Sequence, residues 1–440
     1  MEWTTLQHLD LRHVGRGVRP LQPHAASFHP HQALVAVAIG TYIVEFDALT
    51  GSKISALDIG APAVRMSYSP TSGHTVIAIL QMVQTNNNLG ISILLNRRSV
   101  LLDEDCTIRS CDFDLEQTCV LHSPEKKTEQ ISSDTEVHMA LTPLQPVVFF
   151  GFHKRMSVTV VGTVEGGRAP TKIKTDLKKP IVNLACHPRL PVLYVAYAEG
   201  LIRAYNIHTY AVHYTLQLDN TIKLLGAGAF AFHPTLEWIF VGDRQGTLLV
   251  WDVSTERPIM VGIKQVGSQP ITSVAWLPML RLLVTLSKDG NLHVWETRVT
   301  VNPNGPPTQA NFFEPAAIES IDIPRILSQQ GGEAVYPLPR IKALEFHPKS
   351  NLAALVFAVT CYLTLFIPCL MRQLPTIQKI RPDTVEKGES SFLQFYKVHE
   401  DLQRCYAASV LKEKLSALGS SGVLADHQLQ AQLQEHHLKG

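Results

Sequence analysis

The chain lacks an excess of charge of either sign. Its 440 residues carry 39 basic and 38 acidic side chains, which leaves a formal net charge of +1. A protein with so balanced a charge has no long-range field that would draw in a polyanion. We therefore expect no nucleic-acid partner.

Cysteine pairs are also missing. The seven cysteines form no CxxC pair and no evenly spaced framework of the kind that staples small secreted domains. The first residues, MEWTTLQHLDLRHVGRG, contain no apolar run long enough for a signal peptide or a membrane anchor. These absences favour a cytoplasmic protein with reduced thiols.

Catalytic motifs are absent as well. The chain has no GxSxG, HExxH, GxxxxGK[ST] or GxGxxG, so we predict a non-enzymatic protein without catalytic or cofactor-binding residues. Four histidines each precede a proline in a similar context, and we interpret them as structural rather than metal-binding: His29, His187, His233 and His347. The histidines near the end of the chain, His427, His436 and His437, are better explained as a solvated helix face. No metal site is predicted.

What the chain does contain is a repeat marked by proline. The seven marks are SFHP (27–30), SYSP (67–70), ALTP (140–143), ACHP (185–188), AFHP (231–234), AWLP (275–278) and EFHP (345–348). In four copies a bulky apolar residue followed by a polar or acidic one comes about 17 residues later: Phe46-Asp47, Tyr205-Asn206, Trp251-Asp252 and Trp295-Glu296. A fixed offset of this kind indicates tandem structural units.

Each unit has the pattern of short strands joined by tight turns. In the fifth unit, WIFVG and TLLVWDV are apolar runs on either side of Asp243-Arg-Gln-Gly246, and proline and glycine supply the turn conformations. Units of about 40–45 residues with this ending are typical of WD-repeat propeller blades. The sequence therefore predicts an all-β WD40-type β-propeller of about seven blades, followed by a short α-helical segment. The tryptophans at repeat-equivalent apolar positions are expected to pack in the core: Trp238, Trp251, Trp276 and Trp295.

Long strings in the chain resemble a known family. MEWTTLQHLDLRHVGRGVRPLQPHAASFHP and VNLACHPRLPVLYVAYAEGLIRAYNI are similar to WD-repeat subunits of the plant TPLATE endocytic complex, whose propellers are similar to those of the coatomer alpha and beta-prime subunits. The likeness covers about 1–358 and 409–440. It implies a coat or adaptor subunit that works with clathrin machinery in endocytosis and vesicle trafficking, peripheral at the plasma membrane. The alternative is a WD-repeat substrate receptor of a ubiquitin ligase.

The repeat spacing also predicts the domain boundaries. The propeller is expected to span 1–366, with loop insertions at about 82–104 and 299–340, where the distance between marks is too long. Residues 4–12 alternate in polarity and are expected to add an outer strand to the seventh blade, closing the ring.

The run at 352–371 has three interpretations, one of which is a poorly folded or variant segment. It holds twenty residues without a charge, which is long enough for a membrane span, yet LAALVF and CYLTLF also match two inner strands of blade seven. We favour the strands. Beyond them, 367–408 is predicted to be an irregular or variant segment, since 359–406 departs from the family, and 409–440 a short helical tail.

One basic cluster is the candidate contact site. Lys172, Lys174, Lys178 and Lys179 lie in TKIKTDLKKP, and Lys154 and Arg155 lie in a loop close in sequence. Clustered lysines near an anionic bilayer contribute about 1 kcal/mol each. These six residues are predicted to touch acidic phospholipid or a partner protein, although a solvated surface strand would have the same composition.

Overall fold

The computed structural model describes the chain in several stretches separated by gaps. The described residues are 2–10, 23–61, 63–71, 74–81, 106–123, 137–153, 156–164, 169–175, 177, 179–217, 226, 228–277, 280–300, 309–313, 341–350, 352–357 and 362–369. They all belong to one compact unit, Met1–Cys369. The second unit, Leu370–Gly440, lies outside the described residues, and with it the predicted helical tail at 409–440 and nearly all of the irregular segment at 367–408.

The described strands form seven antiparallel sheets of four strands each, which we number as blades one to seven. Blades one to three follow one another along the chain, with strands in the order inner to outer: β2 (Pro23–Phe28), β3 (Leu34–Ile39), β4 (Tyr42–Asp47) and β5 (Lys53–Asp58); β6 (Ala63–Tyr68), β7 (Thr75–Gln81), β8 (Cys106–Asp112) and β9 (Gln117–His122); β10 (Val137–Leu141), β11 (Val147–Phe152), β12 (Ser157–Gly162) and β13 (Thr171–Lys174).

Blades four to seven continue the same order, except that the outer strand of blade seven comes from the start of the chain. Their strands are β14 (Ile181–Cys186), β15 (Val192–Tyr197), β16 (Ile202–Asn206) and β17 (Val212–Leu216); β18 (Ala229–Phe232), β19 (Trp238–Gly242), β20 (Thr247–Asp252) and β21 (Ile259–Gln265); β22 (Ile271–Leu277), β23 (Leu282–Ser287), β24 (Leu292–Thr300) and β25 (Gln309–Phe313); β26 (Ile341–Phe346), β27 (Ala353–Phe357), β28 (Tyr362–Cys369) and β1 (Glu2–Asp10).

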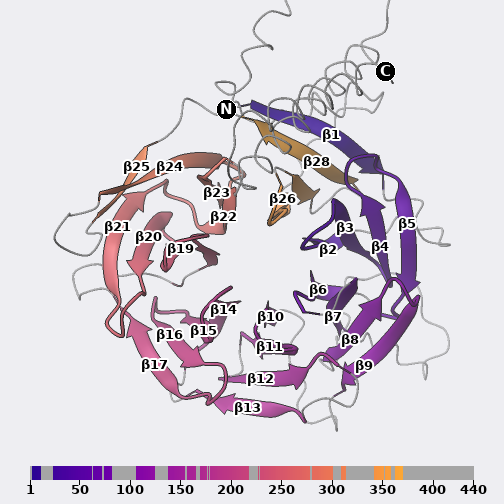
Figure 1. Cartoon of the computed structure of the whole chain (residues 1–440), viewed down its shortest axis with the longest axis horizontal. Helices are drawn as coiled ribbons and strands as arrows, with labels where there is room; N and C mark the ends of the chain where they lie inside the picture. Colours follow the sequence, from indigo (N-terminus) through magenta and orange to yellow (C-terminus); the bar gives the residue numbers. More distant parts are fainter. Residues whose placement is uncertain are drawn as a thin grey trace, which may run out of the picture. The chain divides into compact units, whose positions relative to one another are not determined.

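The blades close into a ring within the first unit. Neighbouring blades contact each other through their inner strands at six of the seven junctions, including β26 of blade seven and β2 of blade one. Blades four and five share a core layer. Figure 1 shows the blades about a common axis, with β2 and β6 inside and β5 and β9 outside. The all-β propeller predicted from the repeats is therefore confirmed.

The first strand of the chain completes the last blade. β1 pairs antiparallel with β28, from Glu2 opposite Cys369 to Asp10 opposite Tyr362. This confirms the closing strand predicted at 4–12 and the two strands predicted in the uncharged run. No helix in the described part of the chain has the length and apolar character of a membrane span.

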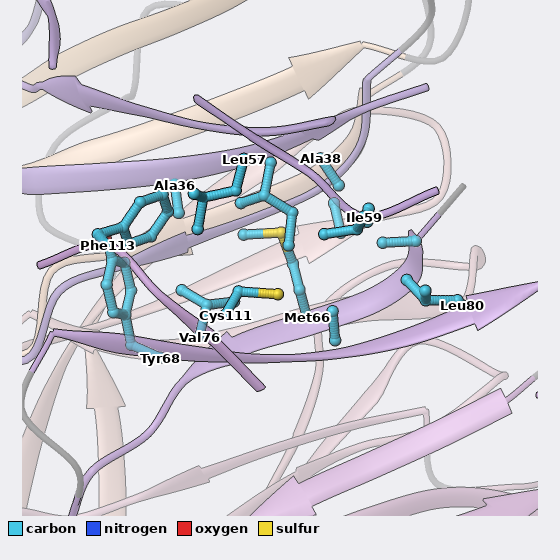
Figure 2. Packing of buried hydrophobic residues seen from close by; sticks show 14 of the residues in the cluster. Ala36, Ala38, Leu57, Ile59, Met66, Tyr68, Val76, Leu80, Cys111 and Phe113 are labelled. Atoms are coloured by element: carbon cyan, nitrogen blue, oxygen red, sulfur yellow. The ribbon is translucent and has the colours of Figure 1, made fainter. Parts of the chain in front are cut away.

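The hydrophobic core lies between the blades as a series of layers. Between blades one and two, for example, Leu57 and Ile59 pack against Met66 and Val76, and Cys111 is buried in the same layer (Figure 2). Trp238, Trp251 and Trp295 are buried in equivalent layers farther round, which confirms their predicted core role, and Trp276 is half-buried against the layer between blades five and six. Since each strand faces two layers, its apolar residues are not confined to alternate positions.

The marker prolines occupy equivalent turns. The six that are described all follow the innermost strand of their blade, while Pro278 lies outside the described residues. The histidine before the proline explains the turn. In blade four, Nδ1 of His187 accepts hydrogen bonds from the backbone N–H groups of Arg189 (3.1 Å) and Leu190 (2.9 Å). The other three marker histidines use Nδ1 in the same way: His29, His233 and His347.

These histidines are neutral in the fold. Burial lowers the pKa of His29, His187 and His233 to about 4, and it lowers the pKa of His347 as well. A neutral ring is needed because a protonated Nδ1 has no lone pair with which to accept the two N–H groups. The structural role predicted for the four histidines is confirmed.

The acidic endings also cap turns. Asp47 Oδ1 accepts from the backbone N–H of Leu49 at 2.7 Å, and Asp252 Oδ1 accepts from that of Ser254 at 2.9 Å. Asn206 does the same for His208 at 2.8 Å, which explains why asparagine replaces the acid in blade four. The repeat motif is thus a set of turn-forming side chains.

The two predicted insertions differ in outcome. Residues 82–104 lie outside the described residues, but Gln81 pairs with Cys106, so the chain leaves and re-enters the same hairpin. The range 299–340 is not a loop throughout, because β24 extends to Thr300 and β25 forms the outer strand of blade six. The remaining residues of that range lie outside the described part.

Candidate interaction surface

The predicted basic cluster is only partly described. Lys172 and Lys174 are exposed on β13, on the opposite face from Ile173, which is buried between blades three and four. Lys179 precedes β14 and forms an ion pair with Glu199. Lys154, Arg155 and Lys178 lie outside the described residues. The structure therefore brings together Lys172 and Lys174 on one face of an outer strand, and it partly neutralises Lys179.

A second surface lies between the outer strands of blades five and six. β21 and β25 contact each other along the circumference of the ring, where a groove of about 380 Å³ is lined by residues 260–264 and 309–312. At Gly262 the strands leave no room for a side chain. A Cβ at this position would lie 2.9 Å from the Cβ of Ala310. A side chain at 262 would therefore close the groove or separate the blades.

Apolar side chains are exposed around this groove. Ile259 and Ile263 of β21 are 54% and 44% exposed, and Phe313 of β25 is 46% exposed. The guanidinium of Arg298 lies over the ring of Phe313 at 4.7 Å and also contacts Glu296 Oε1 at 3.1 Å. Lys264 Nζ lies 5.6 Å from the ring centre of the buried Trp295. The rim of the groove therefore combines exposed apolar side chains with the positive charges of Arg298 and Lys264.

This groove was not predicted from the sequence. The signal was present in IMVGIKQ, which follows the Trp-Asp ending of blade five, where an outer strand is expected. An outer strand with three aliphatic residues and one cation is poorly protected against pairing with another strand. The second half of the groove was hidden because QANFF lay in a range assigned to loop.

A buried ionic network joins blades one and two. Glu45 of β4 is fully buried and accepts hydrogen bonds from the Tyr68 hydroxyl and from His74 Nε2. His74 Nδ1 lies 2.9 Å from Asp114 Oδ1. Burial lowers the pKa of His74, but the hydrogen bonds to Asp114 and Glu45 outweigh this effect and raise the pKa above its ordinary value. The pair links the blades rather than forming a reaction centre, since both ring nitrogens are occupied by carboxylates.

No group of three His, Cys, Asp or Glu side chains that would suit a metal ion occurs among the described residues. The polar groups that converge within the ring serve other purposes. Arg65 Nε donates to the carbonyl of Val137 at 3.0 Å, and Asn183 Nδ2 donates to that of Gly228 at 3.1 Å. In each case a side chain of one inner strand binds the backbone of the following blade.

Comparisons with known proteins agree with this architecture. Residues 263–296 match the family model "WD domain, G-beta repeat", and this stretch runs from the end of β21 through β22 and β23 into β24. One curated relative is the COMPASS component SWD1 of Saccharomyces cerevisiae, which is 35% identical over 102 residues. The match covers 22% of this chain and 23% of the yeast protein, so the chain spans about a quarter of its relative's length.

The described part of the chain forms seven four-stranded blades, and the sixth of them contains most of the match to a WD domain. Structure and sequence therefore indicate the same type of repeat. Side chains in this ring are used to cap turns and join blades. The chain has an all-β WD40 fold, and folds of this kind are typically non-enzymatic scaffolds for protein interactions.

Proposed function

We propose that this protein is a subunit of a coat or adaptor complex that acts with clathrin machinery in endocytosis and vesicle trafficking. The observation that carries the proposal is the long likeness of 1–358 to WD-repeat subunits of the TPLATE type, in strings such as MEWTTLQHLDLRHVGRGVRPLQPHAASFHP. The closed ring supports it, because a rigid platform with variable edges suits a subunit that holds several partners. The site of action would be the cytoplasmic side of the plasma membrane.

The test is affinity purification of the full chain from its native cells, read by mass spectrometry. Recovery of clathrin and adaptor-type proteins is the expected result. Recovery of ubiquitin-ligase components without them would overturn the proposal in favour of a substrate receptor.

A second candidate is a subunit of a COMPASS-type assembly. It is favoured by the 102-residue match to SWD1. That match is short, and WD repeats resemble one another across complexes of different function. The same purification separates the candidates, because COMPASS components would then replace the clathrin machinery among the recovered proteins.

For the basic cluster we propose a contact with acidic phospholipid through Lys154, Arg155, Lys172, Lys174, Lys178 and Lys179. The exposure of Lys172 and Lys174 on one face supports it, while the Glu199 carboxylate beside Lys179 opposes it. Each lysine near an anionic membrane surface contributes about 1 kcal/mol to the binding free energy at moderate salt.

The lipid contact is tested by sedimentation with phosphatidylserine-containing vesicles. The variant K172E/K174E is compared with K53E/K288E, which makes the same change in charge at two exposed lysines on other blades. The β13 variant should bind at least tenfold less lipid than the control. Equal loss in both would mean that only net charge matters.

A further inference from the structure

The outer strand of blade five has an edge that is poorly protected. Among the described strands, β21 pairs only with β20, and β25 pairs only with β24. Free edges are normally guarded by short length, by charge or by proline. β13 follows this rule, with four residues and two exposed lysines. β21 does not, because it has seven residues and exposes Ile259 and Ile263.

The groove beside this edge would accept side chains of an added strand. It is lined by both β21 and β25, and Gly262, which has no side chain, leaves space where a Cβ would meet Ala310. Residues on the two faces of an added strand point alternately inward and outward. One set would therefore enter the groove, and the other would lie on the opposite face of the sheet.

The charges at the groove favour an acidic occupant. Lys264 is the charged residue that lines it, and no carboxylate lies among the lining residues. The nearby carboxylate of Glu296 already contacts Arg298. An approaching acidic peptide would therefore meet a cation without a competing anion.

From these observations we propose that the groove between β21 and β25 binds an extended acidic segment of a partner protein. The segment adds as a strand along the free edge of β21, with apolar residues at alternate positions and a carboxylate beside Lys264. This mode of recognition takes affinity from main-chain hydrogen bonds and specificity from the side-chain pockets. The inference rests on the scaffold role alone and is independent of the endocytic assignment.

The probe is a fluorescein-labelled peptide of alternating valine and glutamate, and its counterpart has lysine in place of glutamate. Fluorescence anisotropy with the full chain should show binding of the acidic peptide. K264E should weaken this binding by about tenfold and strengthen that of the basic peptide. K53E, at an exposed lysine on the outer strand of blade one, is the matched control and should leave both unchanged.

Hydrogen exchange locates the bound peptide. The proposal expects slower exchange of the backbone amides of β21 when the acidic peptide is present, and unchanged exchange in β13. No protection of β21, or equal binding by K264E and the parent, would overturn it. The exchange is also measured without peptide at increasing protein concentration. Protection of β21 that rises with concentration would overturn the proposal, because a second copy of the chain would then occupy the groove.

Failure of this proposal and failure of the endocytic function are distinguishable. The peptide experiment uses purified protein and reports on β21 only. The purification from native cells identifies the proteins of the complex, whichever surface of this protein binds them.

Discussion

His74 of blade two binds the fully buried Glu45 of blade one through Nε2, while its Nδ1 lies 2.9 Å from Asp114 Oδ1. Both ring nitrogens thus face carboxylate oxygens, and both must donate, so the ring is a cation. A buried carboxylate is costly unless a charged partner and hydrogen bonds compensate it. The position of His74 between two blades makes this seam dependent on its charge.

Replacing His74 alone should destabilise the fold. H74Q removes the cation and leaves the buried Glu45 without a charged partner, and we expect a loss of about 2–3 kcal/mol in the free energy of unfolding at pH 6. E45Q/H74Q should be less destabilised than H74Q, since no buried charge then remains. Urea denaturation of the three proteins measures both effects. Equal losses in the single and double variants would contradict the ionic explanation.

The same pair predicts a dependence on pH. The folded pKa of His74 is raised, so its contribution to stability is complete below its unfolded pKa of about 6.5 and is lost as the pH rises through the folded value. The difference in urea midpoint between the parent and H74Q should therefore be largest near pH 6 and smaller at pH 9. A difference that grows with pH would show that the ring acts by packing only.

The marker histidines predict the opposite dependence. Burial lowers the pKa of His187 to about 4, so its contribution is complete above about pH 6.5 and is lost as the pH falls toward 4. Because the His187 ring must stay neutral in the fold, the free energy of unfolding should be about 2 kcal/mol lower at pH 5 than at pH 7.5. In H187N the amide oxygen replaces Nδ1 as acceptor, so the variant should lose less stability on acidification. H213N, at an exposed position, should behave as the parent.

Much of the fold was predictable because the repeat consists of local turn chemistry. Pro30, Asp47 and Gly246 each act within a few residues of their own position, so their spacing along the chain carries the information. The closing strand was predictable for a related reason, since a seventh blade that lacks an outer strand needs one from elsewhere. The range 299–340 was harder, because QANFF has no clear alternation and lies between loop-like residues.

The surfaces were less predictable than the fold. The groove depends on two strands, β21 and β25, that become neighbours only when the ring is assembled. The ionic network joins residues 29 and 40 positions apart, and no short motif contains them. Contacts between blades are set by packing of whole sheets, so composition and spacing do not reveal them.

Two glycines with similar backbone angles should tolerate alanine differently. Gly246 and Gly290 have φ values of +79° and +90°, which disfavour any other residue. A Cβ on Gly246 would lie 2.4 Å from the carbonyl oxygen of Gly267, whereas one on Gly290 would meet nothing within 4 Å. We expect G290A to cost about 1 kcal/mol and G246A about 3 kcal/mol in urea denaturation. Similar costs would mean that the turn after Gly246 shifts freely.

Closure of the ring depends on the first strand of the chain. β1 covers the edge of β28, so removal of residues 1–10 should expose that edge while leaving the other three strands of blade seven in place. An exposed edge pairs with other chains. We therefore expect a thermal midpoint lower by several degrees and association that increases with concentration in light scattering. A synthetic peptide of residues 1–10 should reverse both effects in trans, and a scrambled peptide should not. If the truncated protein stays monomeric and melts as the parent does, the pairing of β1 with β28 contributes nothing to closure.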